Sequence, residues 1–113
     1  MHEVAVAQEI LKIVNQTAEK YDLHKVNKIR LKIGEFTCIE ESALSFAFTA
    51  VAKETICEDS KIVIERVRAR AYCKYCKENF FISYTNKLCP KCNNESTDIS
   101  TGYELLLDRI EGE

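Results

Sequence analysis

The chain has 113 residues, of which 46% are hydrophobic. That is enough for one modest core and too few for two large domains. Its 16 basic and 18 acidic residues give a net charge of −2, which argues against a dominant nucleic-acid or membrane role. The sequence has no apolar run of about 18 residues, as a transmembrane helix requires. It also begins without the basic start and apolar middle of a signal peptide, so we expect a cytoplasmic protein with reduced thiols.

The first half of the chain predicts two helices and one strand. Residues 3–21 repeat apolar side chains every three or four positions, as one face of a helix does. This face comprises Val4, Ala7, Ile10, Leu11, Val14, Ala18 and Tyr21. Residues 26–36 alternate apolar and basic side chains, which predicts a half-buried strand. Residues 40–53 predict a second helix, whose positive N-terminal end Glu40 and Glu41 would suit. Its buried stripe comprises Leu44, Ala47, Phe48 and Val51.

The second half predicts strands on both sides of a cysteine-rich segment. Residues 61–71 have strand character, and a change of phase near Glu65–Arg66 predicts a bulge or bend there. Residues 80–82 predict a short strand inside the cysteine-rich segment. A last strand is expected over residues 102–110, with Tyr103, Leu105 and Leu107 on one face.

These elements together predict an α+β fold. We expect a small sheet of about three strands packed with two helices, plus an inserted zinc-ribbon-like module. The expected domains are a discontinuous α/β domain of residues 1–71 and 98–113, and a zinc-binding module of residues 72–97.

Two CxxC pairs are the strongest chemical signal in the chain. Cys73 and Cys76 form the first pair, and Cys89 and Cys92 form the second after an interval of twelve residues. Two close pairs of thiolates suit a tetrahedral zinc ion, and this spacing favours zinc over the three disulfides that six cysteines could form. Four sulfur ligands leave no position for a catalytic water. We therefore expect a structural zinc site whose metal supplies the folding free energy of the module.

The N-terminus is a second candidate metal site. The Met1 α-amine, the His2 amide and the His2 imidazole lie within reach of one ion, and the Glu3 amide gives a fourth nitrogen. All-nitrogen, roughly planar ligation suits Ni(II) or Cu(II). The first amides of a helix have no intrahelical partner, so they are available for coordination. Such a shallow site suits a metal that is held for transfer.

The other candidate ligands carry weaker signals. His24 is expected to be a solvated loop residue. Cys38 and Cys57 are expected to be small buried hydrophobic residues, and a disulfide or a third metal site is less favoured. No serine or cysteine nucleophile is set beside a base, so the sequence gives little support for an enzyme.

A zinc-ribbon module that binds nucleic acid or protein is the alternative function. Arg66, Arg68 and Arg70 are expected on one face of a strand, and aromatic residues follow at Tyr75, Phe80, Phe81 and Tyr84. Basic residues interleaved with aromatic ones are typical of single-strand binding. We favour a solvated strand face and a small aromatic core, because the overall acidic balance opposes phosphate binding.

The whole chain resembles the HypA/HybF family of nickel metallochaperones. The likeness rests on Met1-His2-Glu3 at the start of an amphipathic helix, a strand ending in Ile33-Gly34-Glu35, a Phe-bearing helix and the two CxxC pairs. Members of that family deliver Ni(II) during maturation of [NiFe]-hydrogenase, and in some organisms of urease, together with the GTPase HypB. The sequence departs from the family at Lys53-Glu54-Thr55, where relatives often have a glycine.

The resemblance implies specific sites and partners for this chain. Met1, His2 and Glu3 would bind nickel, and the four cysteines of the CxxC pairs would bind zinc. The implied partners are a HypB-type GTPase, the [NiFe]-hydrogenase large subunit and urease maturation proteins.

Overall fold

The computed structural model describes residues 3–113 and divides into two compact units. The first unit comprises the described residues up to Lys32, Cys38–Glu65 and Leu106–Glu113. The second unit comprises Ile33–Thr37 and Arg66–Leu105. The second unit therefore includes residues on both sides of the cysteine-rich segment, together with a short segment from the first half of the chain.

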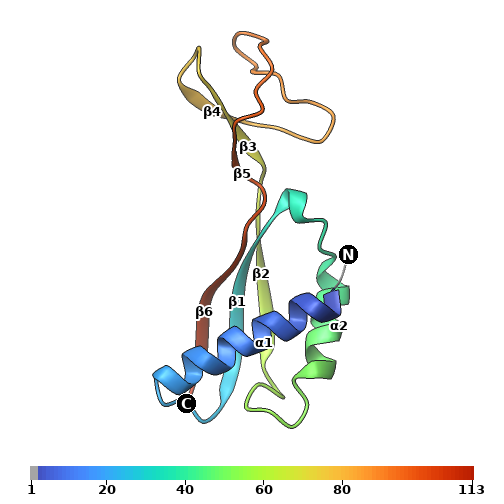
Figure 1. Ribbon diagram of the computed structural model, residues 1–113, viewed down its shortest axis with the longest axis vertical. Coiled ribbons are helices and arrows are strands. Elements are labelled where there is room, and N and C mark those ends of the chain that lie inside the picture. The colour runs from blue at the N-terminus through green and yellow to red at the C-terminus, as the bar shows by residue number, and fades with distance from the viewer. Residues whose placement is uncertain (1–2) are drawn as a thin grey trace. The chain divides into compact units, whose positions relative to one another are not determined.

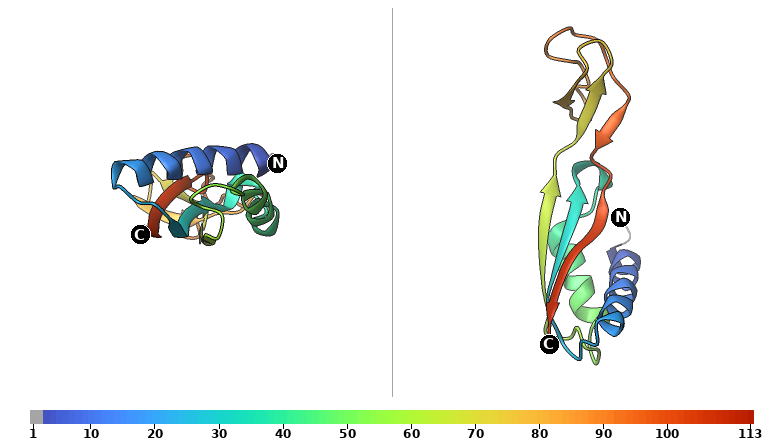
Figure 2. Two further views of the ribbon diagram at one scale, coloured as in Figure 1. Left: turned by 90° about the horizontal axis from the view of Figure 1, so that it is seen from below. Right: turned by 90° about the vertical axis from the view of Figure 1, so that its left-hand side faces the viewer.

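The first unit packs two helices with a three-stranded sheet, as the predicted fold class requires (Figure 1). The helices are α1 (Glu3–Lys20) and α2 (Glu41–Val51), which pack against each other. The strands are β1 (Val26–Gly34), β2 (Lys61–Val67) and β6 (Leu105–Gly112). β1 is the central strand and lies between β2 and β6. Figure 2 shows the three strands side by side.

The buried face of each helix follows the predicted periodicity in its middle. Ala7, Ile10, Val14 and Ala18 are buried on α1, and Leu44, Ala47 and Phe48 are buried on α2. The ends of the predicted α1 face are wrong, because Val4 is 57% exposed and Tyr21 is 65% exposed. Tyr21 lies beyond the last helical residue, so helical spacing no longer places it. The central strand buries Ile29 and Leu31, as its alternation predicts.

The second unit has its own sheet and its own small core. It contains a 3₁₀ turn (Glu35–Thr37) and the strands β3 (Arg70–Cys73), β4 (Glu78–Phe81) and β5 (Ile99–Thr101), in the order β4-β3-β5. β3 pairs antiparallel with both neighbours, and its pairing with β5 shifts register between Arg70 and Ala71. The buried cluster comprises Phe36, Ala69, Ala71, Cys73, Phe80, Ile82 and Cys89.

The strand predicted over residues 61–71 is two strands that belong to different sheets. The break falls at Arg68 and Ala69, later than the bend expected near Glu65–Arg66. At the break, the Ala69 N–H donates to a Glu35 carboxylate oxygen at 2.9 Å, and the Ala69 carbonyl accepts from Ile82 N–H at 3.1 Å. The bond with Ile82 continues the register of β3 with β4, whereas the bond with Glu35 gives the Ala69 amide a side-chain acceptor.

The last strand begins later than predicted and is more exposed. Gly102 has a φ of 132° and lies in the segment that separates β5 from β6. Tyr103 is 64% exposed and Leu105 is 42% exposed, so the expected apolar face of this strand is not buried at these positions. Tyr103 lies before β6 begins, so strand alternation does not place its side chain, and Leu105 is the first residue of this edge strand. No helix within residues 3–113 is long and apolar enough to cross a membrane.

Candidate metal centre

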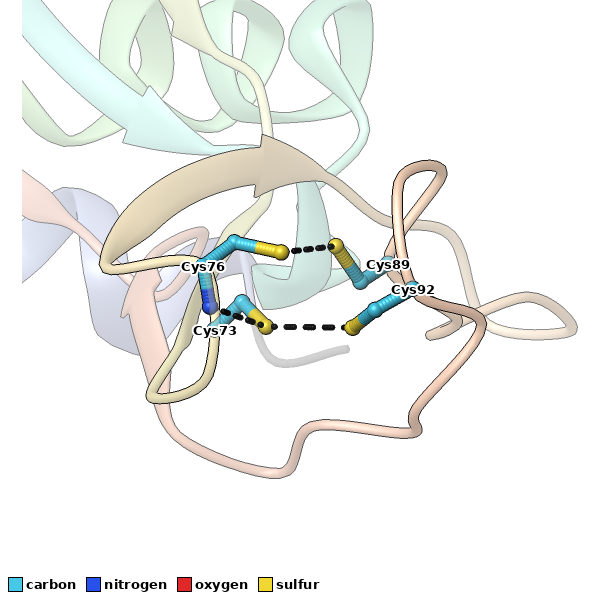
Figure 3. Close-up of side chains that lie close together, drawn as sticks. All are labelled: Cys73, Cys76, Cys89 and Cys92. Atoms are coloured by element: carbon cyan, nitrogen blue, oxygen red, sulfur yellow. Dashed lines mark hydrogen bonds between the residues drawn. The ribbon is translucent and has the colours of Figure 1, made fainter.

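The four cysteines of the CxxC pairs converge in the second unit (Figure 3). Their sulfur atoms all lie within 4.8 Å of one another. The Sγ atoms of Cys73 and Cys92 are 3.6 Å apart, and those of Cys76 and Cys89 are 3.9 Å apart. Cys73 and Cys89 are buried, whereas Cys76 and Cys92 are half-buried. The first cysteine of each pair thus belongs to the core and the second lies nearer to the solvent.

The two CxxC turns share one backbone pattern. The residue after each pair, Lys77 or Asn93, adopts a positive φ of 57° or 58°. In the first turn, Lys77 N–H donates to the Cys73 carbonyl at 2.7 Å; in the second, Asn93 N–H donates to the Cys89 carbonyl at 2.8 Å. The closed turn aims both sulfurs of a pair inward. In the first turn the Cys76 amide also donates to the Cys73 sulfur at 3.4 Å.

Neighbouring groups make the four thiols unequal. The backbone and the side chain of Asn94 hydrogen-bond to the Cys92 sulfur and lower the pKa of Cys92 to about 6; the side-chain amide lies 3.3 Å from that sulfur. The hydrogen bond of Cys76 with Cys92, together with burial, raises the pKa of Cys76 to about 12. Crowded thiolates repel one another, and the positive charge of a divalent cation offsets that repulsion. All of the thiolate ligands can therefore be deprotonated when the metal is bound.

The donor set fits zinc. Four sulfurs at these separations suit the tetrahedral coordination of a structural zinc site. This is the one group of three or more His, Cys, Asp or Glu residues within residues 3–113 that could hold a metal ion. One ion pair lies next to the second CxxC turn. Lys91 donates to both Glu78 carboxylate oxygens at 2.8 and 2.6 Å, and this contact raises the pKa of Lys91. With four sulfur ligands, the centre has no open position for substrate.

Most of the predicted nickel site lies outside the described residues. Met1 and His2 fall there, whereas Glu3 is the first residue of α1 and is half-buried. The Glu40 carboxylate is the N-cap of α2, where it accepts from Ser42 N–H at 3.2 Å, from Ala43 N–H at 2.6 Å and from the Ser42 hydroxyl at 2.6 Å. The prediction that Glu40 suits the positive N-terminal end of this helix is therefore confirmed.

The remaining candidate ligands belong to the first unit, whereas the sulfur cluster belongs to the second. His24 is exposed, as expected of a loop residue, and its backbone N–H donates to the Glu113 carbonyl at 2.7 Å. Cys57 is buried, as predicted, and burial raises the pKa of its thiol. The prediction that Cys38 is buried is wrong: Cys38 is exposed and has a φ of 60°.

The basic and aromatic residues of the alternative function do not share one strand. Arg66 lies in β2, Arg70 lies in β3, and Arg68 lies in the break between them. Phe80 is buried in the core, whereas Tyr75, Phe81 and Tyr84 are exposed. Sequence reasoning missed Asn94 as a partner of the sulfur cluster. Its only signal was its position in the turn directly after the second CxxC pair.

Comparison with known proteins places the whole chain in one group of relatives. Residues 1–112 match the family model described as HypA, hydrogenase/urease nickel incorporation, metallochaperone. The chain is 34% identical over 112 residues to the hydrogenase maturation factor HypA of Salmonella typhimurium, covering 98% of this chain and 95% of the relative. It is also 34% identical over 113 residues to HypA of Desulfitobacterium hafniense, covering 100% of this chain and 99% of that relative.

Solved structures agree with the sequence comparison. The solution structure of the nickel metallochaperone HypA from Helicobacter pylori matches with a TM-score of 0.73 and 26% identity, over 99% of this chain and 97% of that one. The match to both sequence and fold extends beyond the sulfur cluster to nearly the whole chain.

Proposed function

The chain belongs to the HypA family of nickel-incorporating metallochaperones, and we propose that it binds Ni(II) at its N-terminus and delivers it during maturation of [NiFe]-hydrogenase. The observation that carries this proposal is the full-length family match, residues 1–112, in a chain whose four cysteines also converge. A carrier needs no catalytic group, and we propose that the chain is not an enzyme.

Zinc held by Cys73, Cys76, Cys89 and Cys92 has a structural role in this proposal. The second unit buries few apolar side chains, and two residues of its buried cluster are metal-ligand cysteines themselves. A core of this size gives little folding free energy on its own. Metal binding therefore supplies much of the stability of the second unit.

The structural role of zinc has a direct test. The variant Cys92→Ser should lose zinc and deprotect the backbone amides of β3 and β4 in hydrogen exchange, while the amides of α1 and α2 stay protected. A matched control is Cys38→Ser, which removes an exposed thiol outside the cluster. Full protection of β4 in zinc-free Cys92→Ser protein would contradict the structural role.

Nickel is proposed to bind at the Met1 α-amine, the His2 amide, the His2 imidazole and the Glu3 amide. Helix α1 begins at Glu3, and the first amides of a helix have no intrahelical acceptor. A cation at the positive end of a helix is disfavoured, so anionic amides and the Glu3 carboxylate would have to offset that repulsion. The α-amine has an ordinary pKa near 8. Binding displaces its proton, so nickel affinity should fall as the pH falls.

Calorimetric titration of Ni²⁺ into zinc-loaded protein tests the nickel site. His2→Ala and a form with one extra N-terminal residue should both lose binding, because each removes a nitrogen ligand from the set. The matched control is His24→Ala, which removes the only other histidine from an exposed loop. Unchanged affinity in the extended form would refute the α-amine as a ligand.

The partners and the compartment follow from the same proposal. A HypB-type GTPase and the [NiFe]-hydrogenase large subunit are the expected protein partners, and urease maturation proteins are a further target. We place the protein in the cytoplasm, where thiols stay reduced. A nucleic-acid partner is disfavoured by the net charge of −2.

A further inference from the structure

The outer face of the sheet in the second unit carries two arginines and an exposed aromatic ring. Alternation along β3 and β4 places Ala71, Cys73 and Phe80 in the core. It leaves Arg70 and Phe81 on the opposite, exposed face, where Phe81 is 54% exposed. Arg68 precedes β3 and is also exposed. We name Arg68, Arg70 and Phe81 the arginine–phenylalanine face.

The Phe81 ring holds both guanidinium groups close together. The guanidinium carbon of Arg68 lies 3.6 Å from the ring centroid, and that of Arg70 lies 5.4 Å from it. Arg70 is also the direct strand partner of Phe81. Both distances are within the range of cation–π attraction. The stacking restricts two long side chains that would otherwise move in solvent, so less conformational entropy is lost when they bind a ligand.

The backbone beneath this face is fixed by hydrogen bonds. The Arg68 carbonyl accepts from the Thr101 hydroxyl at 2.7 Å. The Ala69 N–H donates to Glu35 at 2.9 Å. β3, which carries Arg70, is the central strand of its sheet. The two guanidinium groups therefore project from a defined backbone, which favours specific recognition.

Neither guanidinium is neutralised by the chain itself. Among the described residues, Arg68 and Arg70 take part in no ion pair with a carboxylate, unlike Lys28, Lys32 and Lys91. The nearby Glu35 carboxylate accepts from the Ala69 N–H and forms no ion pair with Arg68 or Arg70. Two adjacent guanidinium groups that lack an ion-pair partner can take an external anion, because each presents a planar fork of donors that matches a carboxylate.

We propose that the arginine–phenylalanine face binds an acidic segment of a partner protein, with Arg68 and Arg70 each engaging a carboxylate and Phe81 packing against the apolar part of that segment. A protein is favoured over a nucleic acid for two reasons. The face offers two guanidinium groups, which match the two carboxylates of a short acidic segment, whereas binding along a phosphate backbone draws on roughly six to ten cationic contacts. That longer run of contacts also needs a net positive field, which a chain with a net charge of −2 lacks. The proposal does not depend on nickel binding.

The experiment is an NMR titration of the zinc-loaded full chain. The probe is a ten-residue peptide in which five glutamates alternate with five alanines, and the comparison peptide carries five glutamines instead. We expect saturable shifts at the Arg68 and Arg70 side-chain N–H groups and at the Phe81 ring with the glutamate peptide alone. Equal shifts with the glutamine peptide, or shifts confined to other surfaces, would overturn the proposal. A ten-nucleotide oligothymidine that binds this face more tightly than the peptide would overturn it in favour of nucleic acid.

Variants then separate charge from geometry. Arg68→Gln with Arg70→Gln should weaken peptide binding at least about tenfold. Arg68→Lys with Arg70→Lys should weaken it by several-fold, because lysine keeps the charge and loses the planar fork. The matched control is Arg109→Gln with Lys12→Gln, which also removes two positive charges, from exposed positions of the first unit. Equal losses in the control would show a mere net-charge effect and refute the site. The double variants should bind Ni²⁺ with the same affinity as the wild type. A loss of peptide binding can then be told apart from a failure of the proposed nickel site.

Discussion

Gly34→Ala is expected to open the second unit at the point where the end of β1 enters it. A Cβ atom added at Gly34 would lie 2.2 Å from both the carbonyl carbon and the oxygen of Gly102, and 2.6 Å from a Glu104 carboxylate oxygen. The φ of Gly34 lies outside the left-handed region, so alanine could adopt the backbone conformation. The cost is therefore steric, and the first two clashing atoms belong to backbone that cannot rotate away.

The magnitude follows from the contacts that must be broken. Ordinary contact with a Cβ atom begins at 3.4 Å, so one segment has to retreat by roughly 1 Å. That shift breaks the bond from Gly34 N–H to the Glu104 carbonyl, now 2.8 Å, and the bond from Phe36 N–H to the Gly102 carbonyl, now 2.7 Å. Each such bond contributes about 1 kcal/mol, and overpacking costs about 1–3 kcal/mol. The local loss is thus about 3–5 kcal/mol, a large share of a typical folding free energy.

Hydrogen exchange of the zinc-loaded protein measures this loss directly. The amides of Gly34 and Phe36 should exchange at least about a hundredfold faster in Gly34→Ala, as a loss of about 3 kcal/mol implies. Gly112→Ala provides a crossed control, because its Cβ would lie 2.2 Å from the Lys25 carbonyl oxygen in the first unit. It should deprotect residues near Lys25 and spare Phe36. Protection of Phe36 within about threefold of wild type in Gly34→Ala would show that the added Cβ atom is accommodated without opening the second unit.

The first unit offers predictions that rest on Glu40 and Cys57. Glu40→Ala removes the N-cap of α2 and should cost about 1 kcal/mol, measured as a lower melting temperature that Glu40→Asp largely restores; an unchanged melting temperature would contradict the capping role. Buried Cys57 should react with iodoacetamide much more slowly than exposed Cys38, as read by peptide mass spectrometry, and equal rates would show that Cys57 is accessible in solution. Burial raises the pKa of Cys57 above its unfolded value, so the folded state favours the neutral thiol. This contribution to stability is complete below the unfolded pKa of about 8.5 and is lost as the pH rises further. Denaturant titrations from pH 8 to 10 should therefore show a shallower decline in Cys57→Ala, and parallel curves would exclude this linkage.

The periodicity of apolar residues predicted which positions within a single helix or strand are buried. The buried positions of α1 from Ala7 to Ala18 recur at helical spacing, and tertiary structure only selects the side that faces the core. The convergence of the four cysteines was predictable for a related reason. A CxxC pair brings its own two sulfurs together, so one long-range contact between the pairs suffices to assemble the cluster.

Features that depend on distant partners were not predictable. The break at Arg68 and Ala69 is set by the Glu35 carboxylate, which is 34 positions away along the chain from the amide it accepts from. Cys38 precedes the apolar Ile39 in sequence, yet it is exposed and has a positive φ in the segment between the 3₁₀ turn and α2. Leu105 is the exposed first residue of β6, an edge strand, and alternation predicts neither the exact start of a strand nor the order of strands in a sheet.

The end of β1 and the sulfur cluster belong to the same unit. Ile33–Thr37 belongs to the second unit, and Phe36 lies in the same buried cluster as Cys73 and Cys89. The Phe36 ring also contacts Tyr84 and Tyr103, with centroid distances of 4.4 and 5.7 Å. If zinc supplies the folding free energy of this cluster, its removal releases Phe36 and, with it, the end of the central strand of the first unit. Zinc would then govern the order of the segment that leads directly into the N-cap of α2. A structural metal in one unit can in this way influence the other through chain continuity alone.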